Sequence, residues 1–126
     1  MDPAPVCLTQ NRRLAELFGM SYAEDHVDAF NHAVETGGWR AFVDRFADDA
    51  TLEFVGPPVG PFQGRAAIMN AYTDSPPDDK IDINGRVLVD GADLVVPYKW
   101  RTTGATGTMY ITTQGEQITR LTITFD

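Results

Sequence analysis

Three side chains of this sequence can hold or share a proton and stand at positions expected to face the interior: Tyr98, Tyr72 and His26. A tyrosine hydroxyl can donate a hydrogen bond to a carbonyl oxygen, and a histidine titrates near neutral pH. Each has a plainer alternative, because buried tyrosines often bond to nearby backbone and His26, beside Asp25, could lie on a helix surface. The chemistry that these residues indicate is the polarisation of a carbonyl group.

Sites of other kinds lack their motifs. His26 and His32 are six residues apart, which places them on different faces of a helix, and the chain has no cysteine pair or His-x-Glu cluster. The segment 56–61 (GPPVGP) contains three prolines, so it lacks the row of backbone N–H donors that a phosphate needs. We therefore expect no metal and no cofactor.

Length and composition indicate one globular domain. The chain has 126 residues, of which 43% are hydrophobic, and a net charge of −8. This charge argues against a nucleic-acid partner, which requires clustered Lys and Arg. The single Cys7 suits a reducing compartment, and the sequence shows neither a secretory signal nor an apolar run long enough to span a membrane. A cytoplasmic protein without a membrane partner is expected.

The first half of the chain has helical periodicity interrupted by glycines. We expect a tail over 1–8, a short helix over 9–18 that Gly19 ends, and a longer helix over 22–35 that opens with the capping box Ser21–Glu24. Further elements follow: a helix over 39–50, a strand over 51–55, a loop over 56–64 and a helix over 66–73. Residues 1–20 are interpreted as an extension and 21–126 as the domain.

From Lys80 onward the hydrophobic period changes to two, which is typical of strands. One face of the strand 94–103 carries Tyr98 and Trp100. A turn at 104–107 would set Trp100 opposite Ile111, so that Met109 and Ile111 share the face of Trp100. Helices followed by hairpin-linked strands predict an α+β fold with an antiparallel sheet.

Three features stand out within residues 21–125: the segment 46–53 (FADDATLE), the segment 64–68 (GRAAI) and the terminal strands. In these features the chain resembles the ketosteroid isomerase/SnoaL-like superfamily, which has the cone-shaped fold of nuclear transport factor 2. The resemblance implies a curved antiparallel sheet wrapped around the N-terminal helices and a pocket open at one end. The apolar faces indicated by periodicity would line this pocket as substrate-binding residues: Phe30, Val34, Phe54, Trp100, Met109, Ile111, Leu121, Ile123 and Phe125.

The same resemblance places the proton-transfer residues of the isomerases. The catalytic base falls at Phe54, the oxyanion tyrosine at Phe30 and a second carboxyl near Gly107 or Thr108, whereas Tyr72 keeps a tyrosine. Phenylalanine can neither move a proton nor donate to an oxyanion. A slip of one residue would turn Glu53 inward as a base, but it would expel the apolar side chains of that strand.

Three functions follow from these residues. The first is an isomerase- or cyclase-like enzyme, whose reaction class would be isomerase or lyase. It would act on an apolar carbonyl-bearing small molecule, with Tyr98, Tyr72 and His26 as catalytic residues. The alternative is a non-catalytic small-molecule binding protein of the same fold. The third is partner contact, most simply as a homodimer, through a polar outer sheet face: Lys99, Arg101, Tyr110, Thr112, Arg120 and Thr122.

Overall fold

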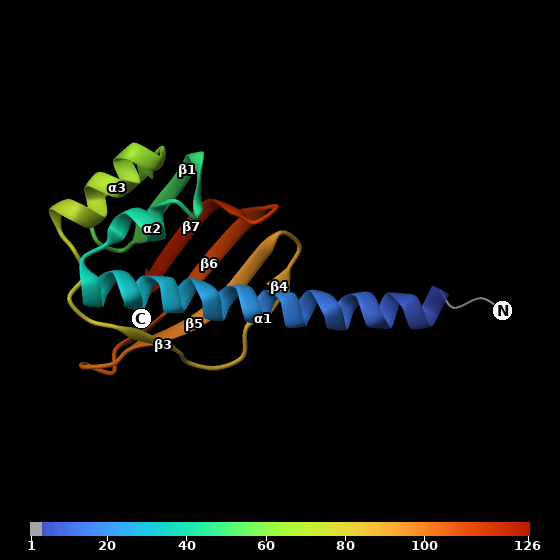
Figure 1. Cartoon of the computed structure of the whole chain (residues 1–126). Coiled ribbons are helices and arrows are strands. Elements are labelled where there is room, and N and C mark those ends of the chain that lie inside the picture. Colours follow the sequence, from blue (N-terminus) through green and yellow to red (C-terminus); the bar gives the residue numbers. More distant parts are fainter. Residues whose placement is uncertain (1–3) are drawn as a thin grey trace.

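A long helix leads into two short helices and a curved sheet (Figure 1). The computed structural model describes residues 4–126, with side chains from residue 18 onward. The helices are α1 (Ala4–Thr36), α2 (Trp39–Val43) and α3 (Arg65–Asp74). The strands are β1 (Phe46–Val55), β2 (Phe62–Gln63), β3 (Ile81–Ile83), β4 (Leu88–Asp90), β5 (Asp93–Trp100), β6 (Thr106–Gln114) and β7 (Gln117–Phe125). The α+β class is confirmed.

The strands form one mixed sheet in the order β2-β1-β7-β6-β5-β3, and β4 also pairs with β5. The expected antiparallel sheet is correct except where β1 runs parallel to β7, with Leu52 beside Leu121. A parallel pair needs a long crossover, and the segment between these strands supplies one. This pairing unites the first strand with the hairpin strands in a single inward face.

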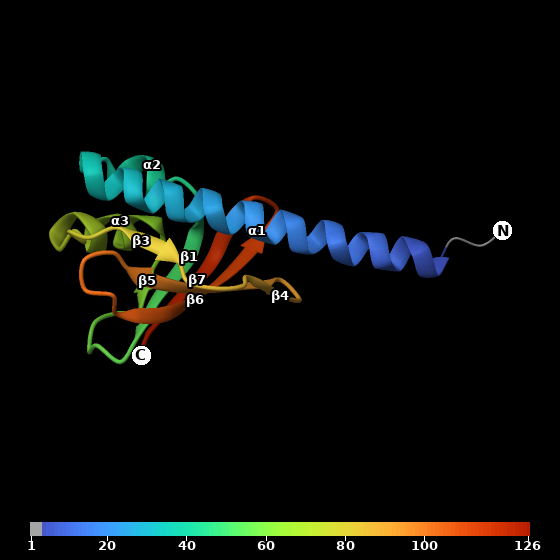
Figure 2. The ribbon, with the colours of Figure 1, turned by 90° about the horizontal axis from the view of Figure 1, so that it is seen from below.

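Helix α1 is continuous, so the predicted stop at Gly19 is wrong, as is the predicted tail over residues 4–8; residues 1–3 lie outside the described residues. A Cβ atom at Gly19 would lie 2.8 Å from side-chain atoms of both Leu94 and Val89. Gly19 therefore permits close approach of α1 to the sheet. Figure 2 shows α1 crossing over the sheet and extending beyond it. Along the described residues, no helix is long and apolar enough to cross a membrane.

The segment after Val43 is a strand, which corrects the helix predicted over 39–50. Phe42 and Phe46 have the spacing of one helix face, and both are buried, but they belong to different elements. The backbone N–H of Ile118 donates to the carbonyl of Arg45 at 2.9 Å and holds the start of β1 in the sheet. Long-range pairing with β7 thus overrides the local helical pattern.

The β5–β6 hairpin has a different register from the predicted one. Leu94, rather than Trp100, lies opposite Ile111, and Val96 lies opposite Met109. The turn lies earlier in the chain, over residues 101–105 between the two strands, and the N–H of Gly104 donates to the Trp100 carbonyl at 2.9 Å. The partner of Ile111 moves by an even number of residues, so Met109 and Ile111 still share the face of Trp100.

An aromatic cluster joins the three helices to the inward face of the sheet. Its centre is Phe42, which is 1% exposed. Five rings lie between 5.2 and 5.9 Å from it, centroid to centroid: His26, Phe30, Trp39, Phe46 and Tyr72. Most of these contacts are edge-to-face, which is favourable for aromatic pairs. The cluster fixes the side chains that form the back of the pocket described below.

Candidate functional site

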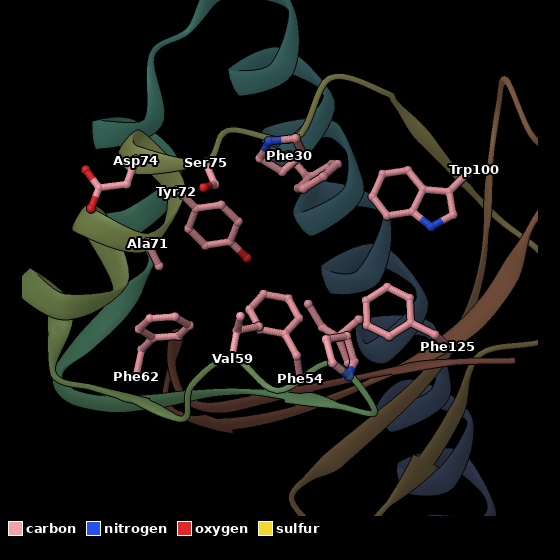
Figure 3. Close-up of a pocket in the computed structure, with 13 residues that line it drawn as sticks. Phe30, Phe54, Val59, Phe62, Ala71, Tyr72, Asp74, Ser75, Trp100 and Phe125 are labelled. Carbon is pink, nitrogen blue, oxygen red and sulfur yellow. The ribbon is translucent and has the colours of Figure 1, made fainter.

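The main pocket opens between α3, the loop after β1 and the inward face of the sheet (Figure 3). Its volume is about 480 Å³, which lies within the range usual for small-molecule sites. The lining is mostly aromatic and aliphatic: Phe30, Phe54, Pro57, Val59, Phe62, Ala71, Tyr72, Asp74, Ser75, Pro77, Trp100, Ile123 and Phe125. Such walls favour an apolar ligand.

Tyr72 supplies the polar group at the back of this pocket. Its hydroxyl points into the cavity in Figure 3, although the residue is only 4% exposed. The ring is stacked on Trp39 with centroids 4.8 Å apart. Among the described residues, the tyrosine hydroxyls with a protein hydrogen-bond partner are those of Tyr22 and Tyr98. Burial raises the pKa of Tyr72, so its hydroxyl stays protonated and can donate.

Charge is nearly absent from the pocket. Of the described lining residues, Asp74 alone carries a carboxylate, and in Figure 3 this group points away from the cavity. Ser75 adds a hydroxyl at the same rim. No three His, Cys, Asp or Glu side chains gather as a metal site in the part of the chain that the structure describes. The main pocket therefore offers a hydrogen-bond donor but no aimed base.

Phe54 stands where the resemblance places a catalytic base. Its ring packs between Phe62 and Phe125, with both centroid distances 6.3 Å. The alternative of an inward Glu53 is wrong, because Glu53 makes an ion pair with Arg120 at 2.6 Å. Strand alternation places this pair on the face opposite Leu52, which is fully buried.

A smaller inner cavity of about 30 Å³ adjoins the main pocket. His26 lines it and is 1% exposed, so the helix-surface alternative for this residue is wrong. The Nδ1 atom of His26 is buried without a hydrogen-bond partner. Burial, and then the nearby charge of Arg45, lowers the pKa of His26 to about 3. The imidazole is therefore neutral at physiological pH.

Tyr98 also lines the inner cavity, but its hydroxyl is engaged. It donates a hydrogen bond to the Thr124 carbonyl at 2.9 Å. A Cβ atom at Gly107, the β6 partner of Tyr98, would lie 2.6 Å from this hydroxyl oxygen. The Tyr98 hydroxyl thus occupies the space beside Gly107, which is near the position where the resemblance places a second carboxyl. Burial raises the pKa of Tyr98 to about 12, so the hydroxyl stays neutral.

The predicted binding residues separate into three groups. Phe30, Phe54, Trp100, Ile123 and Phe125 line the main pocket. Met109 and Leu121 line the inner cavity. Val34 and Ile111 line neither cavity. Ile111 is fully buried in the hydrophobic core, and Val34 is half-buried and packs against that core. Their ligand contacts stay predictions.

Sequence reasoning missed the residues that close the pocket from the loop and the end of α3: Pro57, Val59, Phe62, Ala71, Asp74, Ser75 and Pro77. The available signal was the proline-rich loop directly after an inward strand. Its position over the cavity depends on β2, which folds back on β1 with Phe62 beside Leu52. That pairing is too short to leave a period in the sequence.

Solved structures share this architecture. A nuclear transport factor 2-like protein of unknown function from Cytophaga hutchinsonii has a TM-score of 0.62 at 23% identity, covering 82% of this chain and 88% of its own. A candidate ketosteroid isomerase from Kribbella flavida has a TM-score of 0.61 at 18% identity, covering 81% and 78%. A candidate polyketide cyclase from Sinorhizobium meliloti has a TM-score of 0.59 at 24% identity, covering 79% and 93%. At these identities the likeness shows the fold.

The family of this chain is identified by comparison of its sequence with family models. A comparison with curated proteins gives no match. Residues 27–124, which extend from within α1 almost to the end of β7, match the model of the SnoaL-like domain. The predicted membership of the ketosteroid isomerase/SnoaL-like superfamily is thereby confirmed. The chain belongs to the family of SnoaL-like domains.

Proposed function

We propose that this protein binds an apolar small molecule that carries a carbonyl group, and that Tyr72 donates a hydrogen bond to the carbonyl oxygen. The hydroxyl of Tyr72 carries this proposal, because it points into an apolar pocket and has no partner among the described residues. A hydroxyl in apolar surroundings costs about 1–3 kcal/mol when it is left unpaired. A carbonyl acceptor on an otherwise apolar ligand removes that cost.

The reaction that this arrangement can assist is of the isomerase or cyclase kind. Removal of a proton beside a carbonyl places negative charge on its oxygen, and a fixed donor stabilises that charge. Tyr72 would serve as this donor, and Asp74, the carboxylate of the described lining, would accept the proton after a change of rotamer. The names of two structural neighbours, a candidate ketosteroid isomerase and a candidate polyketide cyclase, agree with this class of reaction.

Binding without catalysis is the second candidate. It is favoured by Phe54, which cannot act as a base, and by the outward direction of the Asp74 carboxylate. In this case Tyr72 would select and orient the ligand only. The two candidates share the pocket and the donor and differ in whether a proton moves.

The test compares Tyr72→Phe with Tyr110→Phe, since Tyr110 is 40% exposed and lies outside both cavities. Binding of a β,γ-unsaturated ketone is measured by calorimetry, and its conversion by absorbance. Loss of one donor to the developing oxyanion should lower kcat/KM about 100-fold, and Tyr110→Phe should leave it unchanged. Binding without conversion in the wild type identifies a binding protein. Absence of binding contradicts both candidates.

A further inference from the structure

The inner cavity and the main pocket meet at a shared wall. Phe30, Tyr72, Trp100 and Ile123 line both spaces. These four side chains come from α1, α3, β5 and β7, and Phe30 and Trp100 meet edge to face with centroids 6.2 Å apart. A group attached to a ligand in the main pocket would therefore enter the inner cavity between these four side chains.

His26 is the polar group of this inner cavity that lacks a partner. Tyr98 already donates to Thr124, and Tyr72 directs its hydroxyl toward the main pocket. The Nδ1 atom of His26 is buried and unpaired, whereas nearly all buried polar groups in proteins have a partner. Apart from the indole N–H of Trp100, which can only donate, the remaining lining is apolar, so the imidazole is the natural hydrogen-bond acceptor for a hydroxyl that enters.

The volume decides what can enter. A space of about 30 Å³ accommodates a single water molecule or one small substituent, and no ring. A charged substituent would lose its hydration in apolar surroundings, which is far more costly than burying a hydroxyl that finds a partner. The group that fits by size and chemistry is therefore a hydroxyl.

We propose that the inner cavity is a subsite for one hydroxyl substituent of the ligand, with the imidazole of His26 as its hydrogen-bond partner. The subsite rests on the proposed function, because the body of the ligand must occupy the main pocket. The ligand class becomes narrower: an apolar, carbonyl-bearing molecule that also carries a phenolic or alcoholic hydroxyl. Without a ligand, one water molecule would take the same place.

The test uses 2-naphthol and 2-methylnaphthalene, which share a ring system and differ by a hydroxyl in place of a methyl group. Affinities are measured by fluorescence titration, and the imidazole ¹⁵N signals are followed by NMR on the wild-type protein. The chain has two histidines, and the exposed His32 serves as an internal control. We expect 2-naphthol to bind about fivefold more tightly, the effect of one net hydrogen bond. It should shift the His26 signals alone, and 2-methylnaphthalene should leave them in place.

Two variants locate the hydroxyl. In His26→Phe, which keeps an aromatic ring, the preference for 2-naphthol should disappear, whereas Tyr72→Phe should retain it. Loss of the preference in Tyr72→Phe but not in His26→Phe would overturn the subsite, as would unchanged His26 signals at saturating 2-naphthol. Binding of both compounds without a preference removes the subsite alone. If neither compound binds, the proposed function falls with it.

Discussion

Tyr98 and Gly107 are direct partners across the β5–β6 hairpin, and the phenol of Tyr98 occupies the space that a side chain at 107 would need. The hydroxyl then reaches across to the Thr124 carbonyl of β7. Three neighbouring strands are thereby connected through one side chain. The hydrogen bond between Tyr98 and Thr124 requires that residue 107 has no side chain. Substitutions at Gly107 and at Tyr98 therefore test the same contact.

Replacing Gly107 with Ala should destabilise the fold strongly. The new Cβ atom would lie 2.2 Å from the Thr124 carbonyl oxygen, which is backbone and cannot turn away. Overpacking of this kind costs about 1–3 kcal/mol. Urea unfolding measures the loss. Gly38→Ala is the matched control, because Gly38 is exposed and its closest contact is the hydroxyl of Thr36 at 3.2 Å, so it should change stability by under about 0.5 kcal/mol. Equal effects at both glycines would contradict the close approach.

Removing the hydroxyls of Tyr98 and Tyr72 should have opposite consequences. Tyr98→Phe loses the bond to Thr124 and should lower the free energy of unfolding by about 1 kcal/mol without weakening ligand binding. Tyr72→Phe removes a hydroxyl that has no protein partner, so stability should stay the same or rise while affinity for a carbonyl ligand falls. Thermal unfolding and calorimetric titration of the two variants separate these effects. A binding defect confined to Tyr98→Phe would reverse the assignment.

Stability should fall with decreasing pH because of His26. Its pKa is lowered to about 3 in the folded protein, below the ordinary value of 6.5, so the unfolded chain binds the proton more readily. Its contribution is fully present above about pH 6.5 and is lost as pH falls toward 3, by about 1.4 kcal/mol per pH unit. The charge of the nearby Arg45 lowers the pKa of His26 further, in addition to the effect of burial. Tyr72 and Tyr98, which line the inner cavity with His26, are uncharged.

Urea unfolding between pH 7 and 4.5 measures this slope. His26→Phe should have a flatter profile than the wild type, because the titrating group is gone, while the carboxylates contribute equally to both proteins. His32→Gln, at an exposed position, should keep the wild-type slope. Parallel profiles for His26→Phe and the wild type would show that His26 does not titrate between the folded and unfolded states.

The outer face of the sheet should mediate dimerisation, as the polar residues there predict. Arg120 of this face is already paired with Glu53, and the predicted Arg101 lies in the turn after β5, paired with Asp82. The half-exposed Tyr110 is then an apolar contact at the centre of β6. Sedimentation should show a dimer for the wild type, and Tyr110→Asp should weaken it at least tenfold by placing a charge in the contact. Val59→Asp, at the mouth of the pocket, should not. A wild-type monomer at all concentrations would remove this prediction.

Periodicity predicted the inward face of β5 correctly because Leu94, Val96 and Tyr98 alternate with half-buried neighbours on a single strand. It also located the helix that carries Tyr72, because the phase of α3 is set within its own ten residues. Both features depend on local geometry alone. A face can therefore be assigned before the partner of the strand is known.

The errors arise where distant segments decide. The segment after Val43 has a helical spacing of phenylalanines but is drawn into the sheet by Ile118 of β7. Gly19 has the appearance of a helix stop, whereas its function is set by Leu94 and Val89, about seventy residues away. The proline-rich loop reaches the pocket only because β2 pairs with β1. None of these contacts has a signature in the sequence near the residue concerned.

The parallel pairing of β1 with β7 determines when the pocket can exist during synthesis. Phe54 lies beside Ile123 in this pair, and both line the main pocket. A nascent chain that has emerged only as far as β6 has the helices and the β4–β5 and β5–β6 hairpins but an open cavity wall, with the aromatic cluster exposed on that side. Closing so long a loop is slow, so assembly of the site should be among the last steps of folding. Until β7 is added, the apolar surface intended for a ligand is available to chaperones and to other unfinished chains.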